Sequence, residues 1–175
     1  MTTTVITGIG PVTAIGIGRI PFGEAVRAGR SGIVPIASFV PRSGSVQEAG
    51  EIRDFSVEDY LESRKNYLDR ASELALAAMA LALEDADLDP QQIAREETDL
   101  CLGTAFGSLA TMGLFFRDYV EKGPRFVKPV LFPHAYSNTA ISLLAMEYGL
   151  RGHHAGYASG RISSSCAIAA AFDRI

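Results

Sequence analysis

The chain has 175 residues, with 16 Lys and Arg against 20 Asp and Glu, which gives a formal net charge of −4. Hydrophobic residues make up 47% of the chain and charged residues 21%, which excludes a disordered acidic tail or a low-complexity protein. The length predicts one domain. The slightly acidic balance argues against nucleic acid as the main ligand, because phosphate binding needs a basic surface.

Two cysteines are too few for a disulfide framework in a chain of this length. Cys101 and Cys166 both lie in apolar stretches, which favours reduced, buried thiols. The first residues lack the basic start and apolar core of a signal peptide. The longest Ala/Leu run, 74–83, is about half as long as a membrane span needs. We therefore expect a cytoplasmic protein without a membrane span.

The first half of the chain is predicted to contain one strand and two helices. Val5-Ile6-Thr7 before Gly8 is typical of a short buried strand that runs into a glycine turn. Residues 70–87 contain no helix breaker and are rich in Ala and Leu all round, which predicts a helix buried on most faces. The other elements, in chain order, are a helix over 22–28, an irregular surface loop over 34–50, a short helical or turn segment over 55–60 and a polar connector over 91–97.

The second half of the chain is predicted to alternate between strands and helices. The elements, in chain order, are a strand over 98–102, a helix opened by Gly107-Ser108 that runs to 120, a turn over 132–134, a helix over 138–148, a strand over 152–159 and a helix over 162–175. Strands that alternate with helices in this way predict a layered α/β domain in which the strands pack between helices.

Two sequence patterns that invite a functional assignment do not support one. Gly8-Ile9-Gly10 follows the first predicted strand, but a dinucleotide-binding loop would need a third glycine where Thr13 stands and an acidic residue about twenty positions later. The three histidines, His134, His153 and His154, have no cysteine or carboxylate at ligand spacing, so we expect no metal site.

The segment Ser159-Gly160-Arg161-Ile162-Ser163-Ser164-Ser165 has the pattern of a sharp turn from a strand into a helix. Such an elbow presents a nucleophile at a helix N-terminus, where the helix dipole and free N–H groups stabilise a thiolate or an oxyanion. The residue at the tip is Arg161, and a guanidinium stays protonated and cannot attack an acyl group. The segment therefore has the form of a catalytic elbow without a nucleophile.

Several segments, in order along the whole chain, resemble β-ketoacyl-acyl-carrier-protein synthases. They are Val5 to Gly10, Ala28 to Ile33, the loop Gly103-Thr104-Ala105-Phe106-Gly107, Phe132-Pro133 with Asn138, and Tyr148 to Gly152. The resemblance implies the thiolase-like fold, a layered α/β architecture with a mixed β-sheet between helices. It identifies residues 1–175 as the first, N-terminal half of such a domain.

The resemblance also assigns roles to individual positions. In the family, the turn after the third predicted strand carries the cysteine that accepts the acyl chain, and that position here is Arg161. Cys166 lies five residues further on, so we interpret it as a core thiol in preference to a displaced nucleophile. The family's catalytic histidines and lysine lie in a second half, beyond the last residue of this sequence. Phe106 and, more weakly, Leu131 are expected to line an acyl tunnel, although a plain core role is open for both.

The partners expected from the resemblance are an acyl carrier protein and a second polypeptide. The carrier protein would deliver acyl chains on its phosphopantetheine arm, and no further cofactor is expected. The basic residues Arg64, Lys65 and Arg70 could meet an acidic carrier protein, or they could form an ordinary solvated helix face. The second polypeptide would be an active ketosynthase subunit or a complementing C-terminal half, in a hetero- or homo-oligomer.

Three functions are therefore compatible with the sequence. The first is a catalytically silent subunit of fatty-acid or polyketide synthesis that resembles a chain-length factor, as Arg161 suggests. The second is the N-terminal part of an active condensing synthase, completed by further sequence or by another chain. The third is a scaffold that binds carrier protein without touching the acyl chain. We also expect the isolated chain to aggregate, because its apolar helices would lack covering partners.

Overall fold

The computed structural model describes residues 3–61 and 63–175, and within them it has the mixed helix and strand content expected of the α/β class. The α-helices are α1 (Arg19–Arg27), α2 (Arg70–Asp85), α3 (Pro90–Arg95), α4 (Leu109–Lys122), α5 (Thr139–Tyr148) and α6 (Ser163–Phe172). The strands are β1 (Val12–Thr13), β2 (Gly16–Ile17), β3 (Ile33–Pro35), β4 (Glu48–Gly50), β5 (Leu100–Gly103) and β6 (His154–Tyr157). Short 3-10 helices are η1 (Val57–Asp59), η2 (Pro124–Phe126), η3 (Pro129–His134) and η4 (Gly160–Ile162).

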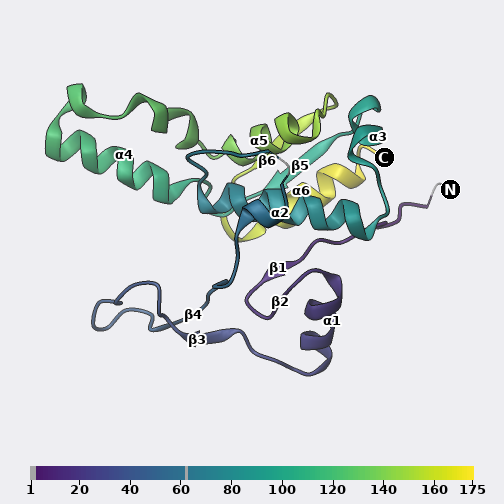
Figure 1. Cartoon of the computed structure of the whole chain (residues 1–175), viewed down its shortest axis with the longest axis horizontal. Coiled ribbons are helices and arrows are strands. Elements are labelled where there is room, and N and C mark those ends of the chain that lie inside the picture. Colours follow the sequence, from purple (N-terminus) through teal and green to yellow (C-terminus); the bar gives the residue numbers. More distant parts are fainter. Residues whose placement is uncertain (1–2, 62) are drawn as a thin grey trace.

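Helix α2 runs through the middle of the molecule, as Figure 1 shows. The strands β5 and β6 and helix α5 lie above it in that view, and α1 lies below it with two hairpins. The predicted helix over 70–87 is confirmed, and every residue between 71 and 83 is buried or half-buried. The Asp69 carboxylate caps this helix by accepting a hydrogen bond from the Ala71 N–H at 2.9 Å.

The strand predicted for Val5-Ile6-Thr7 does not form. Residues 3–11 have no regular structure, and Val5 and Ile6 are 66% and 85% exposed. Instead, the segment runs along α2, where a Cβ on Gly8 would lie 2.3 Å from the Ala82 carbonyl oxygen. Gly8 therefore allows the segment to pack closely on α2, because a side chain at this position would collide with the backbone of the helix.

Two antiparallel hairpins, β1–β2 and β3–β4, were not predicted from the sequence. The second one lies in the stretch predicted as irregular loop, 34–50. It is held by Glu51, whose carboxylate accepts hydrogen bonds from the Ala37 and Ser38 N–H groups, from the Ser38 hydroxyl and from the Arg53 guanidinium. These bonds, led by the one from Ser38, lower the pKa of Glu51 to about 2.

The strands β5 and β6 form a parallel pair, in which Leu100 lies opposite His154 and Gly103 opposite Tyr157. Both strands were predicted, but the described residues contain three separate two-stranded sheets and not one continuous sheet. The Asp99 carboxylate holds the starts of both strands, since it accepts the His153 N–H at 2.6 Å and pairs with Arg174. The Arg174 hydrogen bond, with that from His153, lowers the pKa of Asp99.

Helices α5 and α6 agree with the expected segments 138–148 and 162–175, the latter beginning with the 3-10 turn η4. Segment 55–60 contains η1, and α1 begins three residues before the expected helix 22–28. The expected connector 91–97 is wrong, because Asp89 caps a further helix, α3, with Pro90 in its first turn. Ile93 of α3 packs with Leu83 and Leu150 in the buried core.

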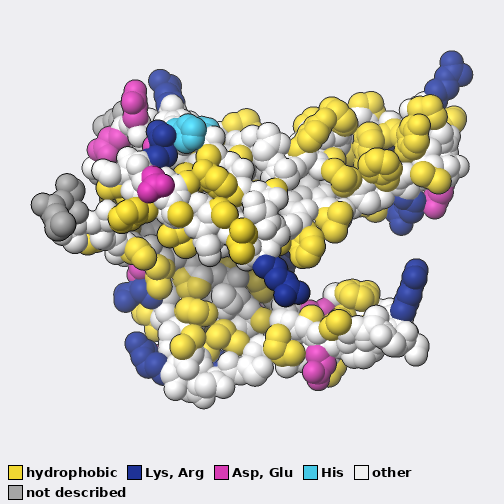
Figure 2. Space-filling view, turned by 180° about the vertical axis from the view of Figure 1, so that it is seen from behind, with side chains coloured by type: hydrophobic (Ala, Val, Ile, Leu, Met, Phe, Trp, Pro, Cys, Tyr) yellow, Lys and Arg dark blue, Asp and Glu magenta, His cyan; other side chains and the backbone are white. Residues whose placement is uncertain are grey.

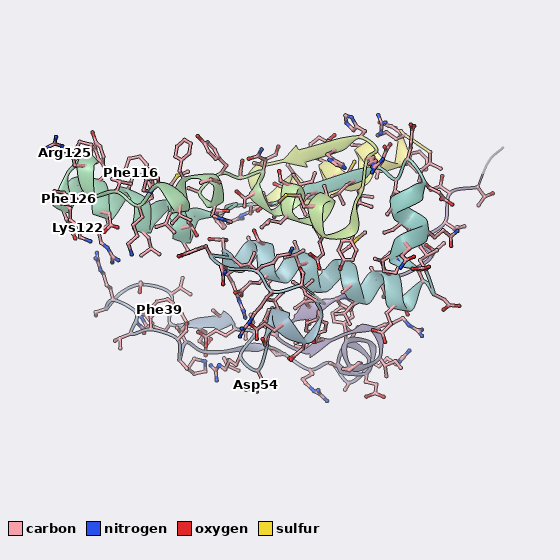
Figure 3. All side chains as sticks on the ribbon, turned by 45° about the horizontal axis from the view of Figure 1, so that its top comes forward. Phe39, Asp54, Phe116, Lys122, Arg125 and Phe126 are labelled. Carbon is pink, nitrogen blue, oxygen red and sulfur yellow. The ribbon has the colours of Figure 1, made fainter. Side chains whose placement is uncertain are left out.

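Helix α4 and the 3-10 helices after it project from the molecule as an arm, which we define as residues 109–134 (Figure 1). The arm carries many apolar side chains that nothing in the described chain covers, and Figure 2 shows them gathered over its surface. The most exposed of them are Leu109 (59%), Phe116 (56%), Val120 (77%) and Phe126 (68%). In Figure 3, Phe116, Lys122, Arg125 and Phe126 lie toward the free end of the arm.

Candidate functional site

The candidate site lies at the carboxyl ends of β5 and β6. The two strands run parallel, so the loop after β5 and the turn after β6 leave the same edge of the pair. The Thr104 N–H donates to the Tyr157 carbonyl at 2.9 Å, which extends the pairing by one step beyond β5. Ligands of α/β folds bind beyond the carboxyl ends of strands, and the structure places Arg161 and Phe106 in these two segments.

The turn after β6 has the form of the predicted elbow. Gly160 adopts a positive φ of 64°, a single 3-10 turn follows, and α6 begins at Ser163. No side chain caps α6 by a hydrogen bond, and the N–H of its first residue, Ser163, donates to the Gly160 carbonyl within the turn. A helix N-terminus without a side-chain cap leaves backbone N–H groups available. This arrangement stabilises negative charge at the tip of the turn.

The residue at the tip of the elbow is Arg161, and its side chain is exposed. Within residues 3–61 and 63–175, none of the ion pairs involves Arg161. A guanidinium can hold an anion at this place but cannot accept an acyl group. The turn after β6 therefore carries at its tip a side chain that cannot accept an acyl group.

The two cysteines are free, and neither is at the tip of the elbow. Cys101 belongs to β5 and Cys166 to the first turns of α6. Both are half-buried, although the sequence predicted buried thiols. Cys166 lies five positions after Arg161, so the helix places it more than one turn away from the tip.

Phe106 lies in the loop after β5, and its side chain is 79% exposed. The Gly107 N–H donates to the Thr104 hydroxyl at 2.9 Å, which closes this loop. Gly107 has a positive φ of 53°, and a Cβ there would lie 2.9 Å from the Ser137 Cα, so glycine is needed on both counts. The loop is thereby fixed against the segment between η3 and α5, and Phe106 projects from it.

Leu131 lies on η3 and is half-buried. Next to it, a row of rings joins the arm to the turn before α5: Phe115 lies 6.0 Å from Phe132, and Phe132 lies 5.0 Å from Tyr136 in an edge-to-face contact. The sequence analysis did not predict this row. Phe132 and Tyr136 are only four positions apart, but Phe115 comes from α4, so the contact of all three is seen only in the fold. The tunnel roles of Phe106 and Leu131 remain predictions.

The three basic residues predicted to meet a carrier protein have different surroundings. Lys65 pairs with Glu147 at 2.5 Å and is largely buried. Arg70 pairs with Glu73 at 3.0 Å, donates to the Ile52 carbonyl at 2.8 Å and stacks over the Phe55 ring. Arg64 is exposed and lies 4.0 Å from Glu58. Of the three, Arg64 thus has the most freely accessible charge.

Among the described residues, no group of three or more histidine, cysteine or acidic side chains could hold a metal ion. His153 and His154 are exposed. His134 ends η3, and its ring lies 6.4 Å from that of Tyr67. Its Nδ1 atom is buried without a hydrogen-bond partner in the described structure.

The sequence analysis included Thr104 and Ser163 in its segments but assigned neither of these hydroxyl residues a role at the site. Ser163 is 2% exposed, and its hydroxyl lies 2.8 Å from the Thr104 carbonyl oxygen, which joins the elbow to the loop after β5. The signal available in the sequence was a hydroxyl residue beside each glycine turn.

No helix in the described part of the chain is long and apolar enough to cross a membrane.

Known proteins share this architecture. One curated relative, 3-oxoacyl-[acyl-carrier-protein] synthase 2 of Synechocystis sp., is 28% identical over 169 residues, which are 96% of this chain and 41% of the relative. The solved structure described as the ishigamide ketosynthase/chain length factor matches with a TM-score of 0.79 at 24% identity, over 97% of this chain and 44% of that chain.

A second solved structure is described as a type II PKS acyl-carrier protein in complex with its ketosynthase bound to the hexaketide. It matches with a TM-score of 0.80 at 17% identity, over 98% of this chain and 46% of that chain. The chain thus spans less than half the length of these proteins, and the two structures support the thiolase-like fold. The family model for the β-ketoacyl synthase N-terminal domain matches residues 1–175. The resemblance carried by the glycine loops and the other matching segments is thereby confirmed, and this chain belongs to the β-ketoacyl synthase family as its N-terminal domain.

Proposed function

We propose that this chain is a catalytically silent β-ketoacyl synthase-like subunit of fatty-acid or polyketide synthesis, which acts beside an active ketosynthase in the manner of a chain-length factor. The observation that carries the proposal is Arg161 at the tip of a well-formed elbow. The side chain is exposed and permanently charged, so it cannot form the acyl thioester that a condensing enzyme needs. The similarity to a structure described as a ketosynthase/chain length factor supports the same assignment.

The proposed partners are an active ketosynthase and an acyl carrier protein. The uncovered apolar surface of the arm supports a protein partner, because exposed patches of this kind usually mark an interface. A related structure contains an acyl-carrier protein with its ketosynthase, which supports a carrier protein as the source of the acyl chain. On this chain, Arg64 is the predicted basic residue best placed to meet an acidic carrier protein.

A second candidate is the N-terminal part of an active condensing synthase. It is favoured by the similarity to 3-oxoacyl-[acyl-carrier-protein] synthase 2. In that case an acyl group would have to be held by a residue other than Arg161, and Cys166 is the nearest thiol along the chain. A third candidate, a scaffold that binds carrier protein alone, would leave the elbow and Phe106 without a role.

Intact-mass spectrometry distinguishes the candidates. The chain is purified from its native host with whatever proteins accompany it, then incubated with acyl-carrier protein loaded with an acyl chain. We expect the acyl group on a co-purifying ketosynthase and no mass increase on this chain. A covalent acyl adduct on this chain would contradict the silent role, and the same measurement on a Cys166→Ser variant would show whether Cys166 carries the adduct.

A further inference from the structure

The hydroxyl of Ser163 connects three backbone segments that meet at the elbow. Its oxygen accepts the Ser159 N–H at 2.9 Å. It also lies 2.8 Å from the Thr104 carbonyl oxygen and 2.7 Å from the Gly160 carbonyl oxygen. A serine hydroxyl accepts at its lone pairs and has one proton, which it can donate to either carbonyl or share between the two. The group therefore contacts the exit of β6, the turn and the end of β5 at once.

The backbone around Ser163 is closely packed. A Cβ on Gly103 would lie 2.4 Å from the Ser163 carbonyl oxygen, so the end of β5 is pressed directly against the first turn of α6. The Ser163 N–H also donates to the Gly160 carbonyl, which closes the 3-10 turn. Ser163 is 2% exposed, whereas the adjacent Ser164 and Ser165 are exposed to solvent.

We propose that Ser163 is the positioning residue of the elbow, which holds residue 161 at the N-terminal end of α6. Residue 161 lies between Gly160 and Ser163, and both are fixed by the same hydroxyl. Without that hydroxyl, the turn can move away from the helix N-terminus, and the stabilisation of negative charge at position 161 decreases. The inference rests on the proposed function only in taking position 161 as the family's nucleophile position.

A thiol introduced at position 161 reports on this geometry, because its pKa depends on its distance from the helix N-terminus. The experiment uses the full chain with Arg161→Cys, alone and combined with Ser163→Ala, Ser164→Ala or Ser165→Ala. The pKa of the introduced thiol is obtained from the pH dependence of its alkylation by iodoacetamide, followed by peptide mass spectrometry. We expect Ser163→Ala to raise this pKa by about one unit, and the two neighbouring substitutions to leave it unchanged.

Alkylation of Cys101 and Cys166 in the same samples reports whether the fold is intact. An unchanged pKa in the Ser163→Ala variant would overturn the proposal. So would an ordinary thiol pKa near 8.5 before Ser163 is replaced. Rapid alkylation of Cys101 and Cys166 after Ser163→Ala would also overturn it, because the hydroxyl would then hold the whole domain and not the elbow. None of these results depends on the acyl transfer assay that tests the proposed function.

Discussion

The buried carboxylate of Asp69 accepts a hydrogen bond from the Thr111 hydroxyl at 2.9 Å, across 42 positions of the sequence. Its other oxygen accepts the Ala71 N–H at 2.9 Å, so one side chain both caps α2 and fastens the first turn of α4 to it. The arm that carries the exposed apolar surface is therefore anchored at the start of the central helix.

Replacing Asp69 with Ala is expected to destabilise the fold by about 2 kcal/mol or more, because the substitution removes a helix cap and leaves the Thr111 hydroxyl buried without its partner. The matched control is Asp89→Ala, which removes the cap of α3, a carboxylate that accepts the Gln91 N–H at 2.8 Å in an exposed position. That change should lower the free energy of unfolding by about 1 kcal/mol. Urea unfolding of both variants measures the difference, and equal losses would contradict the anchoring role of Asp69.

The hairpin β3–β4 should weaken in acid because of Glu51. The pKa of its carboxyl is about 2 in the folded chain against an ordinary 4.5, so the carboxylate contributes its full stabilisation above about pH 4.5 and loses it as the pH falls toward 2. The difference in unfolding midpoint between the natural chain and Glu51→Gln should be constant from neutral pH to about pH 5 and decrease below it. Glu48→Gln on β4, three positions before Glu51, is the control, and a difference that does not change with pH would contradict the prediction.

The sequence predicted those parts of the fold that depend on local pattern. Helix α2 was found because its sequence is rich in Ala and Leu all round and has no helix breaker, and β5 because an apolar run ends at Gly103. Strand β6 was found because a short stretch ends at the turn of Ser159 and Gly160. The strand at Val5-Ile6-Thr7 was wrong because a strand needs a neighbour to pair with, and this segment packs on α2 instead. The hairpin around Glu51 could not be predicted, because its strands are short and are held by side-chain contacts to a loop.

The candidate site was predicted in part. The elbow at Gly160 and Arg161 was identified because a glycine turn followed by serines marks the start of a helix. Its connection to the loop after β5 was not, because the Ser163 contact with Thr104 joins residues 59 positions apart. Contacts over such distances follow from the pairing of β5 and β6, which no local pattern reveals.

The elbow should activate a thiol if one is supplied. In an Arg161→Cys variant, the thiol would lie at the N-terminus of α6, where the pKa of a cysteine falls from about 8.5 into the range of about 3.5 to 7.5. We therefore expect iodoacetamide at neutral pH to modify position 161 faster than Cys101 or Cys166, which are half-buried. Mass spectrometry of the three peptides over time measures the rates. A rate at position 161 no higher than at the two natural cysteines would show that the elbow is wrongly assigned.

Phe106 is predicted to limit the length of the product made together with a ketosynthase. Because the side chain is 79% exposed, Phe106→Ala should leave the unfolding midpoint unchanged while it removes the ring from the proposed tunnel. We expect longer acyl products from the complex, measured by liquid chromatography and mass spectrometry. Phe39→Ala, which removes an equal ring with 62% exposure from the hairpin β3–β4, is the control. Products of unchanged length from a stable Phe106→Ala complex would rule out the tunnel role.

The uncovered arm predicts that the chain associates with itself when no partner is present. Size exclusion with light scattering should show species larger than the monomer at micromolar concentration. The double variant Phe116→Ser and Phe126→Ser should weaken this association about tenfold or more, because it removes two large apolar side chains that are 56% and 68% exposed. Phe39→Ser on the hairpin, a ring exposed to 62%, is the control (Figure 3). A monodisperse natural monomer would contradict the prediction.

The pairing of β5 with β6 also has a consequence for how the protein acquires its shape. The contact between Asp99 and His153 closes a loop of 54 positions that includes α4 and α5. The elbow follows this loop in the sequence, directly after β6. Closing a long loop costs chain entropy before any contact across it is gained, so non-local strand pairs form slowly. The helices α2 and α5 can form from local contacts, whereas the turn that carries Arg161 can take its final position only after β6 has paired with β5. The elbow is thus expected to be among the last parts of the domain to take its final structure during folding.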